Sequence, residues 1–288
     1  MGRILHNTGC KFEKEKSLIM CFFTSLSVNA ASVAKRYGKQ LDIIEAARQI
    51  LAEQELFERA AQEANPAHKV SVYDIHLAEE IYVIPAYAEP HCVIVSGSKE
   101  LQVMQWGLIP RSAKPQDRER YDRKNLLKNA RAETLFEKWP WRMLWAHNRC
   151  IIPVTGFFEP HRLPDGKAQY YYTTLKEGGI FSIAGLWDEW IDSRTGDKLL
   201  SFVLITTEAN NMMRKIHNGG NNPFRMPKIL TAEEEDLWLD PAITSKEEVA
   251  ELLTVFPENE MIAWTVRSKF NYGDPFDESI IEEVEMSR

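Results

Sequence analysis

A few polar residues stand in sequence surroundings that favour a hydrophobic core. Glu159 follows the apolar run IIPVTGFF and ends a predicted strand. A carboxyl group there is partly desolvated, which raises its pKa and suits it to general acid-base catalysis near neutral pH. Pairing with Arg162 is an equally open interpretation. His217 lies beside the glycine-rich segment 218–224, where it occupies either a pocket rim or a purely structural position.

Asn129 and Arg131 are two residues apart, so their side chains face the same side of an extended segment. An amide beside a guanidinium group suits binding of an oxyanion or a phosphate. The surrounding stretch 111–131 holds eight Lys or Arg against three Asp or Glu, in a chain of net charge −7. The protein as a whole is therefore not a basic protein that binds nucleic acid over its whole surface, and any contact with phosphate must come from a local basic patch. The candidates within this stretch are Arg118, Arg120 and Arg123.

Cys21 lies in the stretch KSLIMCFFTSLSVNAAS (16–32), which has two interpretations. The apolar run followed by VNAAS resembles a secretion signal with its cleavage site, although Glu13 and Glu15 stand where a short basic region is expected. A core strand is the commoner identity of such an apolar run. If Met20 is the initiator and is removed, Cys21 presents an α-amine and a thiol on one carbon.

Other kinds of chemistry lack a sequence signature. The four cysteines, Cys10, Cys21, Cys92 and Cys150, form no C-x-x-C pair, which favours a reduced, cytoplasmic setting. No cluster has metal-ligand spacing, and no phosphate-binding or dinucleotide-binding glycine motif is present, so we expect neither metal nor cofactor. No apolar run approaches the length of a membrane span, so we expect no membrane contact.

The elements that must position these residues are mixed. Apolar spacing predicts a helix over 41–64 and strands between 81 and 109. From 149 onward, turn residues at PDG and RTGD divide strand-like runs into hairpins. Further helices are predicted around 210–217, near 232–239 and at 246–254, the last with a capping-box-like start. The pattern predicts an α+β fold, with a bent, barrel-like and mainly antiparallel sheet surrounded by helices.

Four segments together resemble the SRAP family of SOS-response-associated peptidases, or abasic-site-processing proteins. They are MC at 20–21, NARAET at 129–134, CIIPVTGFFE at 150–159, and TTEAN at 206–210 with the IH and RMP that follow it. The likeness runs from about residue 20 to 270. It implies a catalytic domain over 20–288, preceded by a surplus extension or propeptide over 1–19.

The resemblance implies that Cys21, once exposed, forms a covalent thiazolidine crosslink with abasic sites in single-stranded DNA. It further implies that Asn129 is a pocket amide, Glu159 an acid-base group and His217 a second proton-transfer group. Arg131 and Arg225 match positions that hold the DNA backbone. Secretion is not expected, because cleavage after NAA would discard Cys21, and the protein is therefore expected in the cytoplasm. A monomer is taken as the default.

The sequence departs from the family pattern in several places. CFFT replaces the usual C-G-R-F, Pro160 follows Glu159 where tryptophan is usual, and residues are added between His217 and Arg225. The core reaction is therefore expected to persist while DNA contacts differ. Two other functions stay open: a cysteine peptidase or amidohydrolase using Cys21, Glu159 and His217, and a non-catalytic single-stranded DNA-binding protein.

Overall fold

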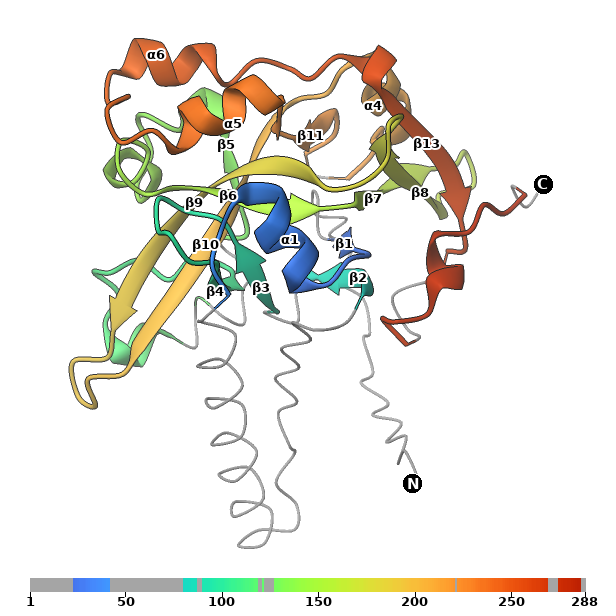
Figure 1. Ribbon diagram of the computed structural model, residues 1–288. Coiled ribbons are helices and arrows are strands. Elements are labelled where there is room, and N and C mark those ends of the chain that lie inside the picture. Colours follow the sequence, from blue (N-terminus) through green and yellow to red (C-terminus); the bar gives the residue numbers. More distant parts are fainter. Residues whose placement is uncertain are drawn as a thin grey trace, which may run out of the picture.

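A computed structural model describes residues 23–41, 80–86, 90–118, 121, 127–220, 222–268 and 274–285. Two mainly antiparallel β-sheets and a few short helices make up these residues (Figure 1), which confirms the predicted α+β class. The helix predicted over 41–64 lies, apart from Leu41, outside the described residues.

The first sheet has five strands in the order β13-β8-β7-β1-β2. Every neighbouring pair in it is antiparallel. Glycine at 166, with φ +85°, closes the β7–β8 hairpin at the predicted PDG turn. The strands are β1 (Phe23–Leu26), β2 (Ile81–Pro85), β7 (Gly156–Arg162), β8 (Ala168–Leu175) and β13 (Met261–Val266).

The second sheet has eight strands built around the long β9–β10 hairpin. Two strands, β4 and β5, run parallel to β10, and the other pairs are antiparallel. A bridge between Val95 and Ile151 links β3 back to β6, so the sheet is strongly curved without a complete barrel ladder. The strands are β3 (His91–Ile94), β4 (Gln102–Trp106), β5 (Asn129–Arg131), β6 (Arg149–Val154), β9 (Phe181–Ile191), β10 (Lys198–Glu208), β11 (Arg225–Pro227) and β12 (Ile229–Leu230).

The chain changes sheets at Thr155, within the run RCIIPVTGFFE that the sequence presents as one strand. β6 before it pairs with β9, whereas β7 after it pairs with β1 and β8. The Thr155 hydroxyl accepts a hydrogen bond from the Ser27 backbone at 2.9 Å, which ties the crossover to the end of β1. This crossover carries Glu159 away from the second sheet.

The helices are short and well capped: α1 (Ala30–Tyr37), α4 (Asn211–Ile216), α5 (Ala232–Leu239) and α6 (Lys246–Glu251). α5 has the bounds that the sequence predicts, and α6 is shorter than the predicted 246–254. Both begin with a complete capping box, at Thr231 and at Ser245, in which side chain and backbone satisfy each other's donors.

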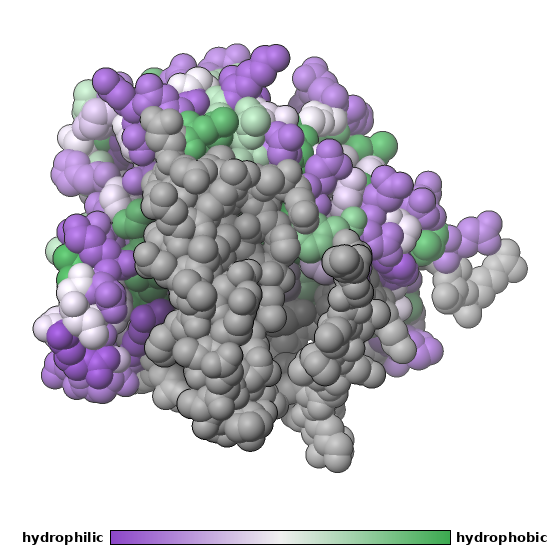
Figure 2. All heavy atoms as spheres, turned by 60° about the horizontal axis from the view of Figure 1, so that its bottom comes forward, coloured by the Kyte–Doolittle hydropathy of each residue, from purple (hydrophilic) through white to green (hydrophobic). Residues whose placement is uncertain are grey.

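Buried apolar side chains from both sheets form one hydrophobic cluster, so the sheets share a core. On the face drawn in Figure 2 the described residues are mostly hydrophilic, with apolar ones in small, separate patches. Among the described residues, no helix has the length and hydropathy that crossing a membrane requires.

Candidate active site

The carboxyl end of β10 brings three of the predicted residues together. β5 runs along one side of it, with Asn129 opposite Leu204 and Arg131 opposite Thr206. β11 pairs with it antiparallel, with Arg225 opposite Glu208. Residues nearly a hundred positions apart in sequence therefore meet at one strand end, as their predicted common role requires.

Glu159 lies on β7 of the first sheet and contacts the residue that ends helix α4. Its side chain is fully buried, and Oε2 lies 3.9 Å from Nδ1 of His217, the residue that ends α4. Strand β7 is joined to the end of α4 by a 2.9 Å hydrogen bond from His161 Nδ1 to the Lys215 carbonyl. The two predicted proton-transfer residues are thus neighbours in a dry environment.

Arg162 does not neutralise Glu159. Its guanidinium group donates to the Gly166 carbonyl at 2.7 Å, within the β7–β8 turn. Its backbone N–H donates to Asn218 Oδ1 at 2.7 Å, and Asn218 Nδ2 donates back to the Arg162 carbonyl at 3.1 Å. The alternative pairing of Glu159 with Arg162 is therefore wrong.

The tautomer of His217 follows from its hydrogen bond. Nδ1 lies 3.1 Å from the carbonyl oxygen of Arg225. A carbonyl oxygen only accepts, so Nδ1 carries the hydrogen and the neutral ring has its lone pair on Nε2. His217 can therefore accept a proton at Nε2 while its ring orientation stays fixed by the backbone of β11.

Helix α4 is held at its start by Asn210, the last residue of the TTEAN segment. The Asn210 side chain accepts from the Met213 backbone at 2.9 Å and donates to the Phe256 carbonyl at 3.0 Å. Because α4 spans only six residues, a change at its first cap is transmitted to His217 at its end.

We expect Asn210→Ala to lower the free energy of unfolding by about 0.5–2 kcal/mol, the usual cost of losing an N-cap side chain. It should also slow the reaction that depends on His217. Ser245→Ala is the matched control, because it removes the N-cap of α6 at comparable cost without touching α4. Urea unfolding and activity measured on both variants check this. Equal activity loss in the two variants would contradict a positioning role for Asn210.

Arg225 is engaged with protein groups. Its two terminal nitrogens donate to the two carboxylate oxygens of Glu133 at 2.7 and 2.8 Å, and one also donates to the Thr206 carbonyl at 2.8 Å. Burial raises the pKa of Glu133, but the hydrogen bonds and charge of Arg225 outweigh this and hold that pKa below its usual value. Arg225 therefore joins β11, β10 and the NARAET segment.

Arg131 differs from Arg225 in its exposure and in its partner. It is exposed, and its Nη2 donates to Asn222 Oδ1 in the segment between His217 and Arg225. Within the described ranges, no carboxylate lies within ion-pair distance of its guanidinium group. The charge of Arg131 also helps to lower the pKa of Glu133. Of the two predicted backbone-binding arginines, Arg131 is nevertheless the exposed one.

The remaining predicted residues lie elsewhere or outside the described ranges. Arg118 packs over Trp190, with its guanidinium carbon 5.5 Å from the ring centroid. Trp190 pairs with Leu199, which is about 23 Å along β10 from Thr206 at 3.3 Å per residue. Arg118 is therefore remote from the carboxyl end of β10. Cys21, Arg120 and Arg123 lie outside the described residues.

The two cysteines in the described part of the chain are poor nucleophiles. Burial raises the pKa of the Cys92 thiol to about 12 and that of Cys150 further still. Since the thiolate is the reactive form, both thiols are inert at neutral pH. The described residues also hold no group of His, Cys, Asp and Glu arranged to bind a metal ion.

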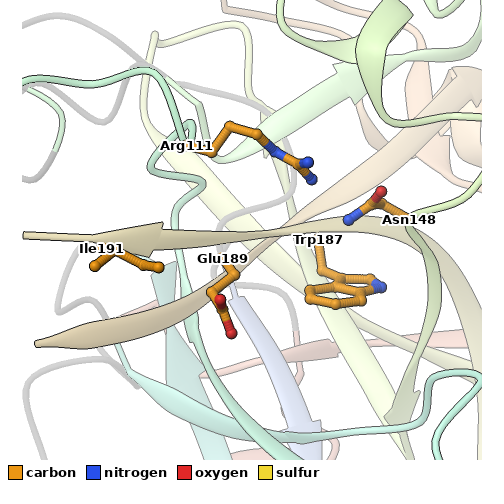
Figure 3. Close-up of a pocket in the computed structure, with 5 residues that line it drawn as sticks. All are labelled: Arg111, Asn148, Trp187, Glu189 and Ile191. Atoms are coloured by element: carbon orange, nitrogen blue, oxygen red, sulfur yellow. The ribbon is translucent and has the colours of Figure 1, made fainter. Parts of the chain in front are cut away.

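A pocket of about 450 Å³ lies on the second sheet, away from the carboxyl end of β10 (Figure 3). It contains none of the predicted site residues. Arg111 at its edge is paired with Asp188, with an Nε–Oδ1 distance of 2.8 Å. Its lining consists of Arg111, Asn148, Trp187, Glu189 and Ile191.

Sequence reasoning missed four residues that shape the site: Glu133, Asn210, Asn222 and Phe224. Glu133 and Asn210 stand inside the NARAET and TTEAN segments, so their position was a usable signal. Asn222 and Phe224 belong to the added residues before Arg225, which marked the segment as unusual without indicating its contacts.

Comparison with known proteins gives four consistent findings. The model of the family described as SOS response associated peptidase (SRAP) matches residues 20–272. The abasic site processing protein YoqW of Bacillus subtilis is 37% identical over 180 residues, covering 62% of this chain and 75% of that protein. The abasic site processing protein HMCES of Xenopus tropicalis is 29% identical over 163 residues, which cover 50% of this chain and 46% of the Xenopus protein. A crystal structure of a Bacteroides thetaiotaomicron protein superposes with a TM-score of 0.77 at 35% identity, covering 92% of this chain and all of the other.

Proposed function

Because this chain belongs to the SOS response associated peptidase (SRAP) family, we propose that it processes abasic sites in single-stranded DNA by covalent capture on Cys21. The relatives that carry the name abasic site processing protein support the substrate class. The observation that carries the proposal is the buried Glu159–His217 pair. His217 is hydrogen-bonded to the Arg225 carbonyl on β11, and β11 pairs with the same end of β10 as Asn129 and Arg131 on β5. The mature domain would begin at Cys21, after removal of residues 1–19 and Met20.

The position of β1 supports Cys21 as the nucleophile. Phe23 is opposite Phe158, the residue that directly precedes Glu159. Cys21 comes two residues before Phe23, and two residues extend a chain by at most about 7 Å. A connection of this length is compatible with Cys21 acting beside Glu159, whereas both described cysteines are inert.

The proposed chemistry uses both groups of an N-terminal cysteine. An abasic deoxyribose opens to an aldehyde, to which the neutral α-amine adds to give a carbinolamine. Such an amine titrates near a pKa of about 8, so a useful fraction is neutral at pH 7. Loss of water gives a Schiff base, and the thiol then adds to its carbon while the thiol proton passes to nitrogen. A five-membered thiazolidine results, and its closure is fast because the two reactants are tethered.

The neighbouring side chains would move the protons that these steps require. Opening of the sugar ring and departure of water each need a proton donor, and Glu159 and His217 would supply and recover that proton. The Asn129 amide would orient the sugar oxygen. Arg131 would bind the adjoining phosphate, because its side chain is exposed.

Replacing Arg131 by glutamine should weaken binding of single-stranded DNA and reduce the slope of log K against log salt by about 0.7, the value for one phosphate contact. Fluorescence anisotropy over a salt series measures both. Arg194→Gln is the control, since Arg194 is paired with Asp192 at the far end of the β9–β10 hairpin. An unchanged slope in Arg131→Gln would remove Arg131 from the DNA interface.

The test of the function is adduct formation. Protein beginning at Cys21, verified by intact mass, is incubated with single strands that carry an abasic site. Heat-stable adducts are expected with these strands, and none with intact strands or with a strand whose sugar lacks an aldehyde. A duplex with the same abasic site should react more slowly, because the lesion must leave the base stack. No adduct with any strand would overturn the proposal.

Peptide-bond cleavage is the second candidate, favoured by the family description and by the position of Cys21 behind nineteen residues and Met20. The same pocket could release its own amine and then use it. The intact mass of the protein made from the whole sequence, with and without Glu159→Gln, tests whether this pocket cleaves the chain before Cys21. Self-cleavage predicts loss of the first twenty residues only when Glu159 is present.

A further inference from the structure

Phe224 combines an unfavourable backbone with an exposed ring. Its φ is +61°, and it is the only residue other than glycine with positive φ in the described ranges. Bulky side chains rarely adopt this left-handed region, and where they do the strain tends to lie at functional sites. Yet 41% of the residue is exposed, so burial of the ring in the core does not offset the strain.

Two backbone hydrogen bonds fix this conformation. The Phe224 N–H donates to the carbonyl of His217 at 2.8 Å, and the Phe224 carbonyl accepts from Ala209 at 2.9 Å. The next residue is Arg225, whose carbonyl orients the His217 ring. The ring of Phe224 is therefore attached rigidly to the backbone that surrounds His217.

Two arginine side chains lie near Phe224. The guanidinium carbon of Arg214 lies 5.8 Å from the Phe224 ring centroid, and Arg214 is also paired with Glu208 at 3.2 Å. Arg131 donates to Asn222, two residues before Phe224. A single exposed aromatic ring with two guanidinium groups at its segment offers too little apolar area for a protein partner, whose interface buries on the order of 1,200 Å² or more. It matches the chemistry of a nucleotide, which has a flat base and an anionic phosphate.

We propose that Phe224 is a stacking platform for the nucleobase next to the abasic position. This inference rests on the proposed function, since it names a further contact to the same single-stranded DNA. Phe224 would hold the neighbouring base outside the reacting centre. That contact fixes the position of the DNA strand along the protein, so that the sugar without a base lies at Glu159 and His217.

The test separates loss of the ring from relief of strain. Phe224→Gly removes the ring and allows positive φ without cost, whereas Phe224→Tyr keeps an aromatic ring on the same backbone. Both variants and the wild type are titrated with short single strands carrying a tetrahydrofuran abasic analogue, which has no aldehyde and cannot crosslink. In one strand normal bases flank the analogue, and in two others the base on one side is also missing. Thermal unfolding of each variant confirms the fold.

Phe224→Gly should bind the strand with both flanking bases about 5- to 150-fold more weakly than wild type. This range corresponds to about 1–3 kcal/mol of base–aromatic stacking at 1.4 kcal/mol per tenfold change. Removing the stacked base should cost the wild type a similar factor and cost Phe224→Gly little, while Phe224→Tyr stays near wild type. Equal affinity of wild type and Phe224→Gly for the fully flanked strand would overturn the stacking role and leave the proposed function standing. Failure of the wild type to bind any of these strands would overturn both.

Discussion

Cys21→Ala, in a chain that begins at residue 21, is expected to abolish the heat-stable adduct with abasic single-stranded DNA. The variant keeps its α-amine, so it can still form the Schiff base, but no thiol remains to close the ring. Tethered ring closure corresponds to an effective concentration of about 10⁵–10⁸ M. Its loss therefore leaves only a reversible imine, which hydrolyses on heating.

Borohydride reduction makes this prediction sharper. A reduced imine is stable, so Cys21→Ala should give an adduct with borohydride and none without it, whereas the wild type gives one under both conditions. A chain that retains residues 1–20 has no amine on Cys21 and should give no thiazolidine. Cys92→Ala is the matched control and should behave as wild type, because desolvation raises the pKa of the Cys92 thiol and keeps it in the unreactive protonated form. A heat-stable adduct with Cys21→Ala would require a different nucleophile.

Glu159→Gln should slow adduct formation by about 10²–10⁴-fold, the usual contribution of a positioned proton-transfer group. Glutamine keeps the size of the buried side chain and removes its exchangeable carboxyl proton. His217→Asn should have an effect of the same order, because Nε2 is the only ring nitrogen left to accept a proton. The rate is measured with protein in excess over DNA, so that the chemical step is observed separately from binding.

The double variant tests whether the two groups act as a unit. If Glu159 and His217 serve the same proton-transfer step, the double variant should be little slower than either single one. Glu137→Gln and His147→Asn change the same residue types at exposed positions and should leave the rate unaltered. Rates of Glu159→Gln and His217→Asn within twofold of wild type would remove the pair from the mechanism.

Local sequence was sufficient for the elements whose signals are local. The RTGD turn marks the β9–β10 hairpin, and glycine at 196 adopts φ +81° there. The capping residues Thr231 and Ser245 mark the starts of α5 and α6, because the side chain and the backbone it caps are three residues apart. The family motifs likewise indicated Asn129, Glu159 and His217 as candidate site residues from the sequence alone.

Long-range pairing could not be predicted in the same way. β5 and β11 have three residues each, too few to show a hydrophobic period, and both form only against β10. The crossover at Thr155 is invisible in an unbroken apolar run, since buried strands of either sheet have the same composition. The pairing of Arg225 with Glu133 joins residues 92 positions apart, and it gives a predicted DNA contact an internal partner instead.

Hydrogen bonds between His217 and the residues Phe224 and Arg225 hold together the two ends of the segment 218–223. The position of these ends therefore does not depend on the residues between them. Residues can be gained or exchanged inside it without displacing the imidazole, because the anchors stay on β11 and α4. Changes confined to the middle of this segment would alter the surface beside Phe224 while leaving the His217 ring hydrogen-bonded to the Arg225 carbonyl.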